Sequence, residues 1–166
     1  MKKIFVTLLA LCLTLVGTKA QTLSEGSLDV LQSGSRVRAI IDFSGAEIMG
    51  MNEIDFSEFE EDWFKDKPGI QSRLLRYANA ALAGRLFLGN YSHTEYTLRL
   101  IVLTVSDKGD YDCDAELLDA EDNLVATITG IFGPGGIIGT KLNLMKDGAK
   151  STGAILGTFL RKNISN

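Results

Sequence analysis

Closely spaced acidic residues between positions 110 and 121 give the strongest chemical signal in the sequence. Asp110, Asp112, Asp114 and Glu121 take oxygen-ligand places of a twelve-residue calcium-binding loop. Ala115, however, stands where the sharp turn of such a loop needs glycine. The alternating spacing is also typical of the solvent face of a β-strand. An acidic strand face is therefore the first interpretation, and a calcium site is the alternative.

A glycine-rich segment, GPGGIIGTK at residues 133–141, leads into the last predicted helix. A turn of this kind at a helix N-terminus can bind an anion with its backbone N–H groups. A phosphate-binding loop needs a glycine directly followed by Lys and then Ser or Thr, whereas here Gly139 is followed by Thr140 and Lys141. The segment predicts a flexible connection, with an anion site as the alternative.

Residues for acid–base or nucleophilic catalysis are few. His93 is the only histidine, and it lies in a predicted loop. Cys113 faces the predicted core, so a His–Cys pair is disfavoured. The acidic run at residues 58–62 could supply a carboxylate pair, but the solvated face of a helix explains it as well. The sequence predicts a non-catalytic protein without a cofactor, and a small hydrolase is an alternative.

Two features favour an interaction role. Trp63 and Phe64 give a short predicted helix apolar groups on more than one side, which suits core packing or a docking surface. Gly153 and Gly157 lie four residues apart in the last predicted helix, and each glycine costs a helix about 1 kcal/mol. Close packing of that helix on the sheet would offset this cost. A helix contact with a second subunit, and hence a homo-oligomer, is the alternative.

The N-terminus has the form of a secretory signal peptide, which we assign to residues 1–20. Lys2 and Lys3 precede an apolar run at 4–16, and small residues lead to a cleavage site after Ala20. Cys12 lies within the run, but Leu11 replaces the small residue that a lipoprotein signal places before its cysteine. We therefore expect export to the periplasm or outside the cell, with a lipid-anchored form as the less favoured alternative.

Removal of the signal peptide makes the chain more acidic. The formal net charge changes from −4 to −7, with 14 basic and 21 acidic residues remaining. A strongly acidic chain is a poor partner for nucleic acid or an anionic membrane surface. Only Cys113 remains after cleavage, so no internal disulfide is possible, and no transmembrane segment is expected in the mature chain.

Residues 21–34 are rich in Ser and Gly and predict a flexible leader or a short edge strand. A single α+β domain is expected over 35–166. Hydrophobic periodicity predicts the order β-α-α-β-β-β-α. The predicted strands cover 36–48, 95–106, 111–117 and 124–132, and the predicted helices cover 55–66, 70–88 and 140–162. We expect a four-stranded, mainly antiparallel sheet with the helices packed on one face.

Three segments carry a resemblance to known proteins: VRAIIDFSGAEI, VATITGIFGPGG and GAKSTGAILGTFLRK. With this layout the chain resembles bacterial envelope proteins of unknown function that are similar to the auxiliary component of ABC-type transporters. The resemblance implies a non-enzymatic envelope role and transfers no functional residue. The leading hypothesis is an exported, non-catalytic module that binds a protein or another envelope component, and a calcium- or anion-dependent binding protein is the second.

Overall fold

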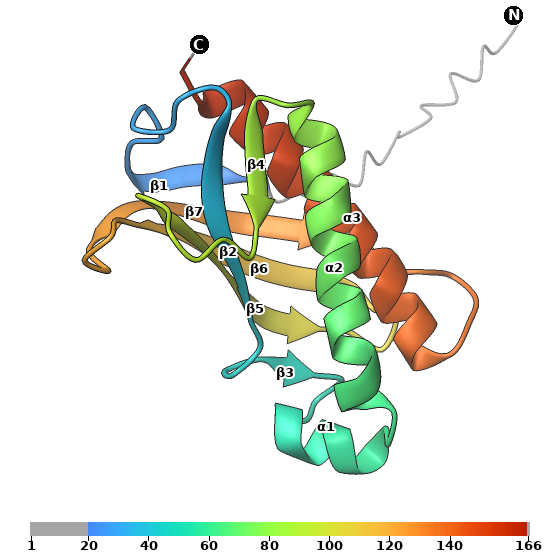
Figure 1. Cartoon of the computed structure of the whole chain (residues 1–166). Coiled ribbons are helices and arrows are strands. Elements are labelled where there is room, and N and C mark those ends of the chain that lie inside the picture. The colour runs from blue at the N-terminus through green and yellow to red at the C-terminus, as the bar shows by residue number, and fades with distance from the viewer. Residues whose placement is uncertain (1–19, 166) are drawn as a thin grey trace, which may run out of the picture.

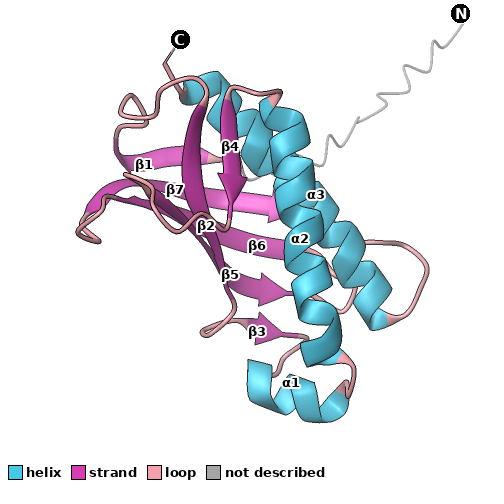
Figure 2. Ribbon diagram, in the orientation of Figure 1, coloured by secondary structure: helices cyan, strands magenta, loops and turns pink. Residues whose placement is uncertain are grey.

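The computed structural model describes residues 20–165, which form one mixed sheet and three helices (Figures 1 and 2). Cys12 and all but the last residue of the expected signal peptide lie outside the described residues. In chain order the elements are β1 (Thr22–Gly26), β2 (Ser35–Asp42), β3 (Glu47–Ile48), α1 (Glu53–Phe59), α2 (Trp63–Leu82), β4 (Leu86–Gly89), β5 (Thr97–Val105), β6 (Tyr111–Leu118), β7 (Leu124–Gly133) and α3 (Lys141–Asn163). No helix within residues 20–165 is long and apolar enough to cross a membrane.

The sheet has seven strands in the order β1-β7-β6-β5-β2-β4, and β3 pairs with β5 beyond the end of β2. The β1, β7, β6 and β5 strands pair antiparallel, whereas β2 pairs parallel with both β5 and β4. The prediction of four strands was therefore wrong, and half of the strand pairings are parallel. The predicted order β-α-α-β-β-β-α was also wrong, because β1, β3 and β4 are additional strands. The predicted strands at 95–106, 111–117 and 124–132 are confirmed as β5, β6 and β7.

Two of the added strands lie at the edges of the sheet. The segment 21–34 contains β1, so the structure shows an edge strand there, and Leu28 and Leu31 behind it are buried.

The other edge strand is β4 at residues 86–89, a segment that was predicted as the end of the second helix. That helix was predicted over 70–88, whereas α2 begins and ends earlier, at Trp63 and Leu82. The helix ends where Ala83 (φ 51°) and Gly84 (φ 83°) adopt left-handed backbone, a common way for a helix to terminate.

The helix boundaries near α1 also differ from the predicted range 55–66. Asn52 is the N-cap of α1, because its side-chain oxygen accepts a 3.0 Å hydrogen bond from the Asp55 backbone N–H. Pro68 lies inside α2, where the sequence analysis placed the gap between the predicted helices 55–66 and 70–88. It is the sixth residue of the helix, beyond the first four N–H groups that have no partner within a helix, so α2 continues without the hydrogen bond that residue 68 would otherwise donate to the Phe64 carbonyl.

Helices α2 and α3 form one layer on a single face of the sheet, as predicted (Figure 1). They run in the same direction, because Asp66 and Lys146 are paired near their starts and Ala78 lies against Gly157 near their ends. The core lies between this layer and the sheet. Its largest fully buried side chains include Trp63, Tyr111, Phe43 and Phe56. The prediction of the last helix at 140–162 is confirmed by α3, which Thr140 caps.

Candidate functional site

The four candidate calcium ligands do not form one site. Asp110 accepts hydrogen bonds from the Gly135 backbone N–H (2.7 Å) and the Ser106 hydroxyl (2.8 Å), and Asp114 accepts one from the Gly130 N–H (3.0 Å). Asp112 lies on the same strand face as Asp114, whereas Glu121 lies in the turn after β6. Within residues 20–165, no three His, Cys, Asp or Glu side chains form a group that could hold a metal ion.

The glycine-rich segment uses backbone donors within the chain. The Gly135 N–H binds Asp110, and the Gly136 N–H donates to the Lys108 carbonyl over 3.1 Å. These bonds attach the base of the segment to the turn between β5 and β6. The carboxylate of Asp110 therefore takes one of the donors through which this turn would have bound an anion.

The candidates for nucleophilic chemistry lie apart. Cys113 is fully buried in β6, and burial raises the pKa of its thiol above the ordinary value, which disfavours the reactive thiolate. His93 is exposed and borders a hollow of about 450 Å³ together with Ser35, Arg36 and Glu95. Among residues 20–165, His93 makes no hydrogen bond with a hydroxyl or a carboxylate. The hollow thus lacks the nucleophile–base contact on which a hydrolase of this kind depends.

Trp63 belongs to the core and not to a docking surface. Its ring makes edge-on contacts with Phe43 and Phe56, at centroid distances of 5.4 and 5.3 Å. Its Nε1–H donates a 2.9 Å hydrogen bond to Glu53, which also binds the Lys67 ammonium group. This side chain therefore anchors the start of α2 to α1.

Gly153 and Gly157 serve a contact within the chain. A Cβ atom at Gly153 would collide with the Leu74 carbonyl, and one at Gly157 would collide with the Ala78 carbonyl. Both glycines thus let α3 approach the backbone of α2 closely. The predicted packing partner of α3 at these positions was the sheet or a second subunit, and the observed partner is α2. Their place in the helix pair leaves this glycine stripe buried and unavailable for a subunit contact.

Five strongly exposed apolar side chains belong to α1, to the start of α2 and to the loop that enters α3. We call this group the apolar end: Ile54, Phe59, Phe64, Ile137 and Ile138. Ile137 and Ile138 are 96% and 89% exposed, in the loop that enters α3. Phe64 (62%) and Phe59 (58%) lie at the start of α2 and the end of α1. Phe64 is thus the one member of the predicted Trp63–Phe64 pair that reaches the surface.

Charged groups border the apolar end. The Lys141 ammonium group lies 3.9 Å from the centre of the Phe59 ring, which joins α1 to the start of α3 by a cation–π contact. Glu58, Glu61 and Asp62 are exposed between Phe59 and Phe64 or beside them, and Lys65 pairs with Asp62 at 3.1 Å. The border therefore carries charges of both signs, with an acidic excess on the α1 side.

Ile137 and Ile138 were not predicted from the sequence as interaction residues. Two adjacent isoleucines in a glycine-rich loop have no helical or strand periodicity that would bury them. That mismatch between residue type and position is the signal that could have identified them. Ile54 gives no such signal, because one apolar residue on a helix is ordinary.

No protein-family model matches the chain, and no curated protein matches it in sequence. Among solved structures, it is similar to the PelC dodecamer from Paraburkholderia phytofirmans, with 12% identity and a TM-score of 0.49 over 89% of this chain and 99% of that chain. A protein from Xanthomonas campestris assigned to DUF330 gives 10% identity and a TM-score of 0.41 over 86% and 91% of the two chains. No family is assigned on these likenesses.

Proposed function

We propose that the chain is an exported, non-catalytic module of the bacterial envelope that binds a protein partner through the apolar end. The single observation that carries this proposal is the near-complete exposure of Ile137 and Ile138 in a loop whose base is fixed by hydrogen bonds. The signal-peptide pattern supports export.

The energetics favour burial of this surface. Covering an exposed isoleucine contributes about 1.5–3 kcal/mol of hydrophobic free energy. Single exposed apolar residues are ordinary, but grouped ones at one end of a small protein are typical of interaction sites. The five side chains of the apolar end belong to α1, the start of α2 and the loop before α3, and the contact of Lys141 with Phe59 joins α1 to the start of α3. A partner that extends across this end of the molecule would cover side chains from all three segments.

The acidic excess of this border favours a protein over an anionic membrane as the partner. Glu58, Glu61 and Asp62 would approach an anionic lipid surface together with Phe59 and Phe64, and like charges would oppose that approach. A protein with an apolar patch and a basic border would match both features. Such complementarity favours the correct partner over others.

The arrangement of the reactive residues supports a role without catalysis. The only histidine borders an open hollow without a hydrogen-bonded nucleophile among residues 20–165. The remaining cysteine is enclosed in the core with a raised pKa. Neither group has the setting of an activated nucleophile or base.

A photo-crosslinking amino acid placed at Ile138 tests the binding surface in the cells that make the protein. We expect one discrete adduct with a protein. Leu124, which is also a half-exposed apolar residue but begins β7 at the far side of the sheet, is the matched control position and should give none. Equal adducts at both positions, no adduct at Ile138, or adducts with lipid alone would overturn the proposal.

The export part of the proposal has its own measurement. Intact mass and N-terminal analysis of the protein from fractionated cells should give a chain that starts at Gln21 in the periplasmic or extracellular fraction. A cytoplasmic chain that retains Met1 would contradict export. A chain that begins with lipidated Cys12 would contradict the assigned cleavage site.

A further inference from the structure

The charges of the chain are segregated between the helical layer and the rest of the molecule. Helices α2 and α3 contain nine Lys and Arg residues against two Asp residues, a net charge of +7. The remaining part of residues 21–166 contains five basic and nineteen acidic residues, a net charge of −14. The chain as a whole is acidic, but this helical layer is strongly basic. The argument that a negative net charge disfavours anionic partners therefore does not hold for the surface of α2 and α3.

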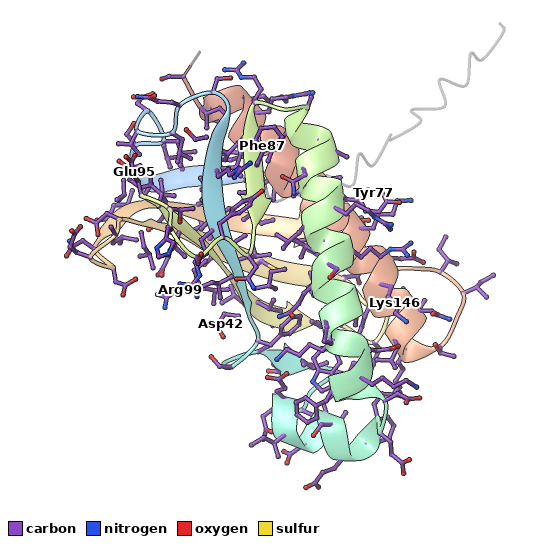
Figure 3. All side chains as sticks on the ribbon, in the orientation of Figure 1. Asp42, Tyr77, Phe87, Glu95, Arg99 and Lys146 are labelled. Atoms are coloured by element: carbon purple, nitrogen blue, oxygen red, sulfur yellow. The ribbon has the colours of Figure 1, made fainter. Side chains whose placement is uncertain are left out.

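Within this layer, three cations surround one aromatic ring, and a fourth lies beside them. Arg76 and Lys150 each lie 5.3 Å from the centre of the Tyr77 ring, and Arg73 lies 6.0 Å from it. Lys146 joins the same surface from the start of α3. Figure 3 shows Tyr77 and Lys146 on the helical side of the molecule, away from Arg99 on the sheet.

A hollow of about 380 Å³ opens between these side chains, lined by Gly69, Ser72, Arg73, Arg76 and Lys146. It offers two guanidinium groups, an ammonium group and a hydroxyl group. Each of these groups can donate hydrogen bonds, and no carboxylate belongs to the lining.

The positive charge at the hollow is only partly neutralised. Lys146 pairs with Asp66 at 2.7 Å, and Arg73 approaches Asp147 at 3.6 Å. The Nε–H of Arg73 has no hydrogen-bond partner within the described chain, although it is shielded from solvent. Arg76 and Lys150 are exposed and have no ion-pair partner among residues 20–165. Two full positive charges thus remain available to a ligand.

We propose that this hollow is a binding site for a phosphate group, held by Arg73, Arg76 and Lys146, with the charge of Lys150 beside it at the Tyr77 ring. Guanidinium groups bind phosphate through paired N–H donors, and two of them can clamp one group from two sides. The open shape suits a phosphate that is part of a larger molecule. Its source is either a soluble phosphate compound or the headgroup of an anionic phospholipid.

The test compares two double variants with the same change in charge. Arg76→Gln with Lys150→Gln removes the two unpaired cations at the hollow. Arg161→Gln with Lys162→Gln removes two exposed cations at the far end of α3 and is the matched control. Nuclear magnetic resonance titration with inorganic phosphate, and sedimentation with phosphatidylglycerol or phosphatidylcholine vesicles, measure binding. Urea unfolding confirms that both variants remain folded.

We expect the hollow variant to lose binding by about tenfold or more, since a charged hydrogen bond lost from a site weakens binding by that order. The control should retain most of its affinity. Binding of inorganic phosphate that the hollow variant loses supports a soluble ligand. Binding only to phosphatidylglycerol vesicles, with the same loss, supports a lipid headgroup. No binding in either arm, or equal losses in both variants, would overturn the site. The apolar end is unchanged in every variant, so this test and the crosslinking test succeed or fail separately.

Discussion

The indole Nε1 of Trp63, the first residue of α2, donates a 2.9 Å hydrogen bond to Oε1 of Glu53, the first residue of α1. The Lys67 ammonium group binds the same carboxylate and lies 5.9 Å from the centre of the indole ring. The three side chains form a half-buried network that connects α1 to the long helix. Because both donors depend on one carboxylate, Glu53 determines whether the network is satisfied.

We expect Glu53→Ala to destabilise the protein by about 1–3 kcal/mol, because it leaves the indole N–H and the Lys67 ammonium group without their acceptor. Glu53→Gln keeps one acceptor oxygen and should cost less. Urea unfolding followed by tryptophan fluorescence measures both variants, since Trp63 is the only tryptophan. Equal costs for the two variants would show that the acceptor oxygen has no role.

Gly157→Ala should destabilise the protein by about 1–3 kcal/mol, although alanine favours helices more than glycine does. The added methyl group would enter the space of the Ala78 carbonyl. Gly69→Ala is the matched control, because Gly69 also lies in a helix and an added Cβ meets nothing within 4 Å. That variant should stabilise the protein by up to about 1 kcal/mol. Thermal unfolding of both variants checks the opposite signs, and a stabilised Gly157→Ala variant would contradict the close helix contact.

Tyr111→Phe should stabilise the protein by about 1 kcal/mol. The Tyr111 hydroxyl is buried and has no hydrogen-bond partner among the described residues, so it is desolvated without compensation. The same burial raises the pKa of the hydroxyl above its ordinary value. Urea unfolding compares this variant with Tyr77→Phe, which changes a less buried ring and should shift stability by less than about 0.5 kcal/mol. A clear loss of stability in Tyr111→Phe would reveal a partner for the hydroxyl.

Protonation of Asp42 at acidic pH is expected to lower the stability of the folded protein. The Ser44 backbone N–H donates a 2.9 Å hydrogen bond to its carboxylate, and this bond, with help from the Arg99 and Lys67 charges, lowers its pKa below the ordinary value of 3.8. A lowered pKa in the folded state means that the carboxylate stabilises the protein above about pH 4, and that this stabilisation is lost as pH falls through the folded pKa.

Asp42→Asn should therefore be less stable than the parent at pH 7, by less than about 1 kcal/mol, and the difference should shrink below pH 4. Urea unfolding between pH 7 and pH 3 measures this difference. A gap that stays constant across the range would show that the effect does not come from ionisation of Asp42.

The sequence predicts correctly those strands and helices whose hydrophobic residues recur at a constant spacing, every second residue in a strand and every third or fourth in a helix. The strands β5, β6 and β7 alternate in sequence, and α3 has apolar residues at every third or fourth position. The strand β4 could not be predicted in this way. Leu86 and Leu88 are consistent with the end of a helix, and their strand conformation depends on pairing with Ser35 and Val37, about fifty residues earlier in the chain.

The candidate interaction residues also divide into features that local sequence predicts and features that only the folded chain shows. The spacing of Gly153 and Gly157 predicted a close approach, but only the folded chain shows that the neighbour is α2. Trp63 and Phe64 are adjacent and similar in sequence, yet one is buried and the other is 62% exposed, because adjacent helical residues point in different directions. The basic hollow was not predicted, since net charge averages over two oppositely charged layers.

The pairing of β1 with β7 has a consequence for when the sheet can be completed during synthesis. Thr22 lies opposite Thr129, so the first strand of the sheet meets the last strand across more than a hundred intervening residues. Contacts this distant in sequence form only after the intervening chain is available. A chain that is made from its N-terminus onward leaves β1 without its partner until residues 124–133 of β7 have been added. The sheet is therefore completed only late in synthesis, and a chain interrupted before that point would leave strand edges open to aggregation.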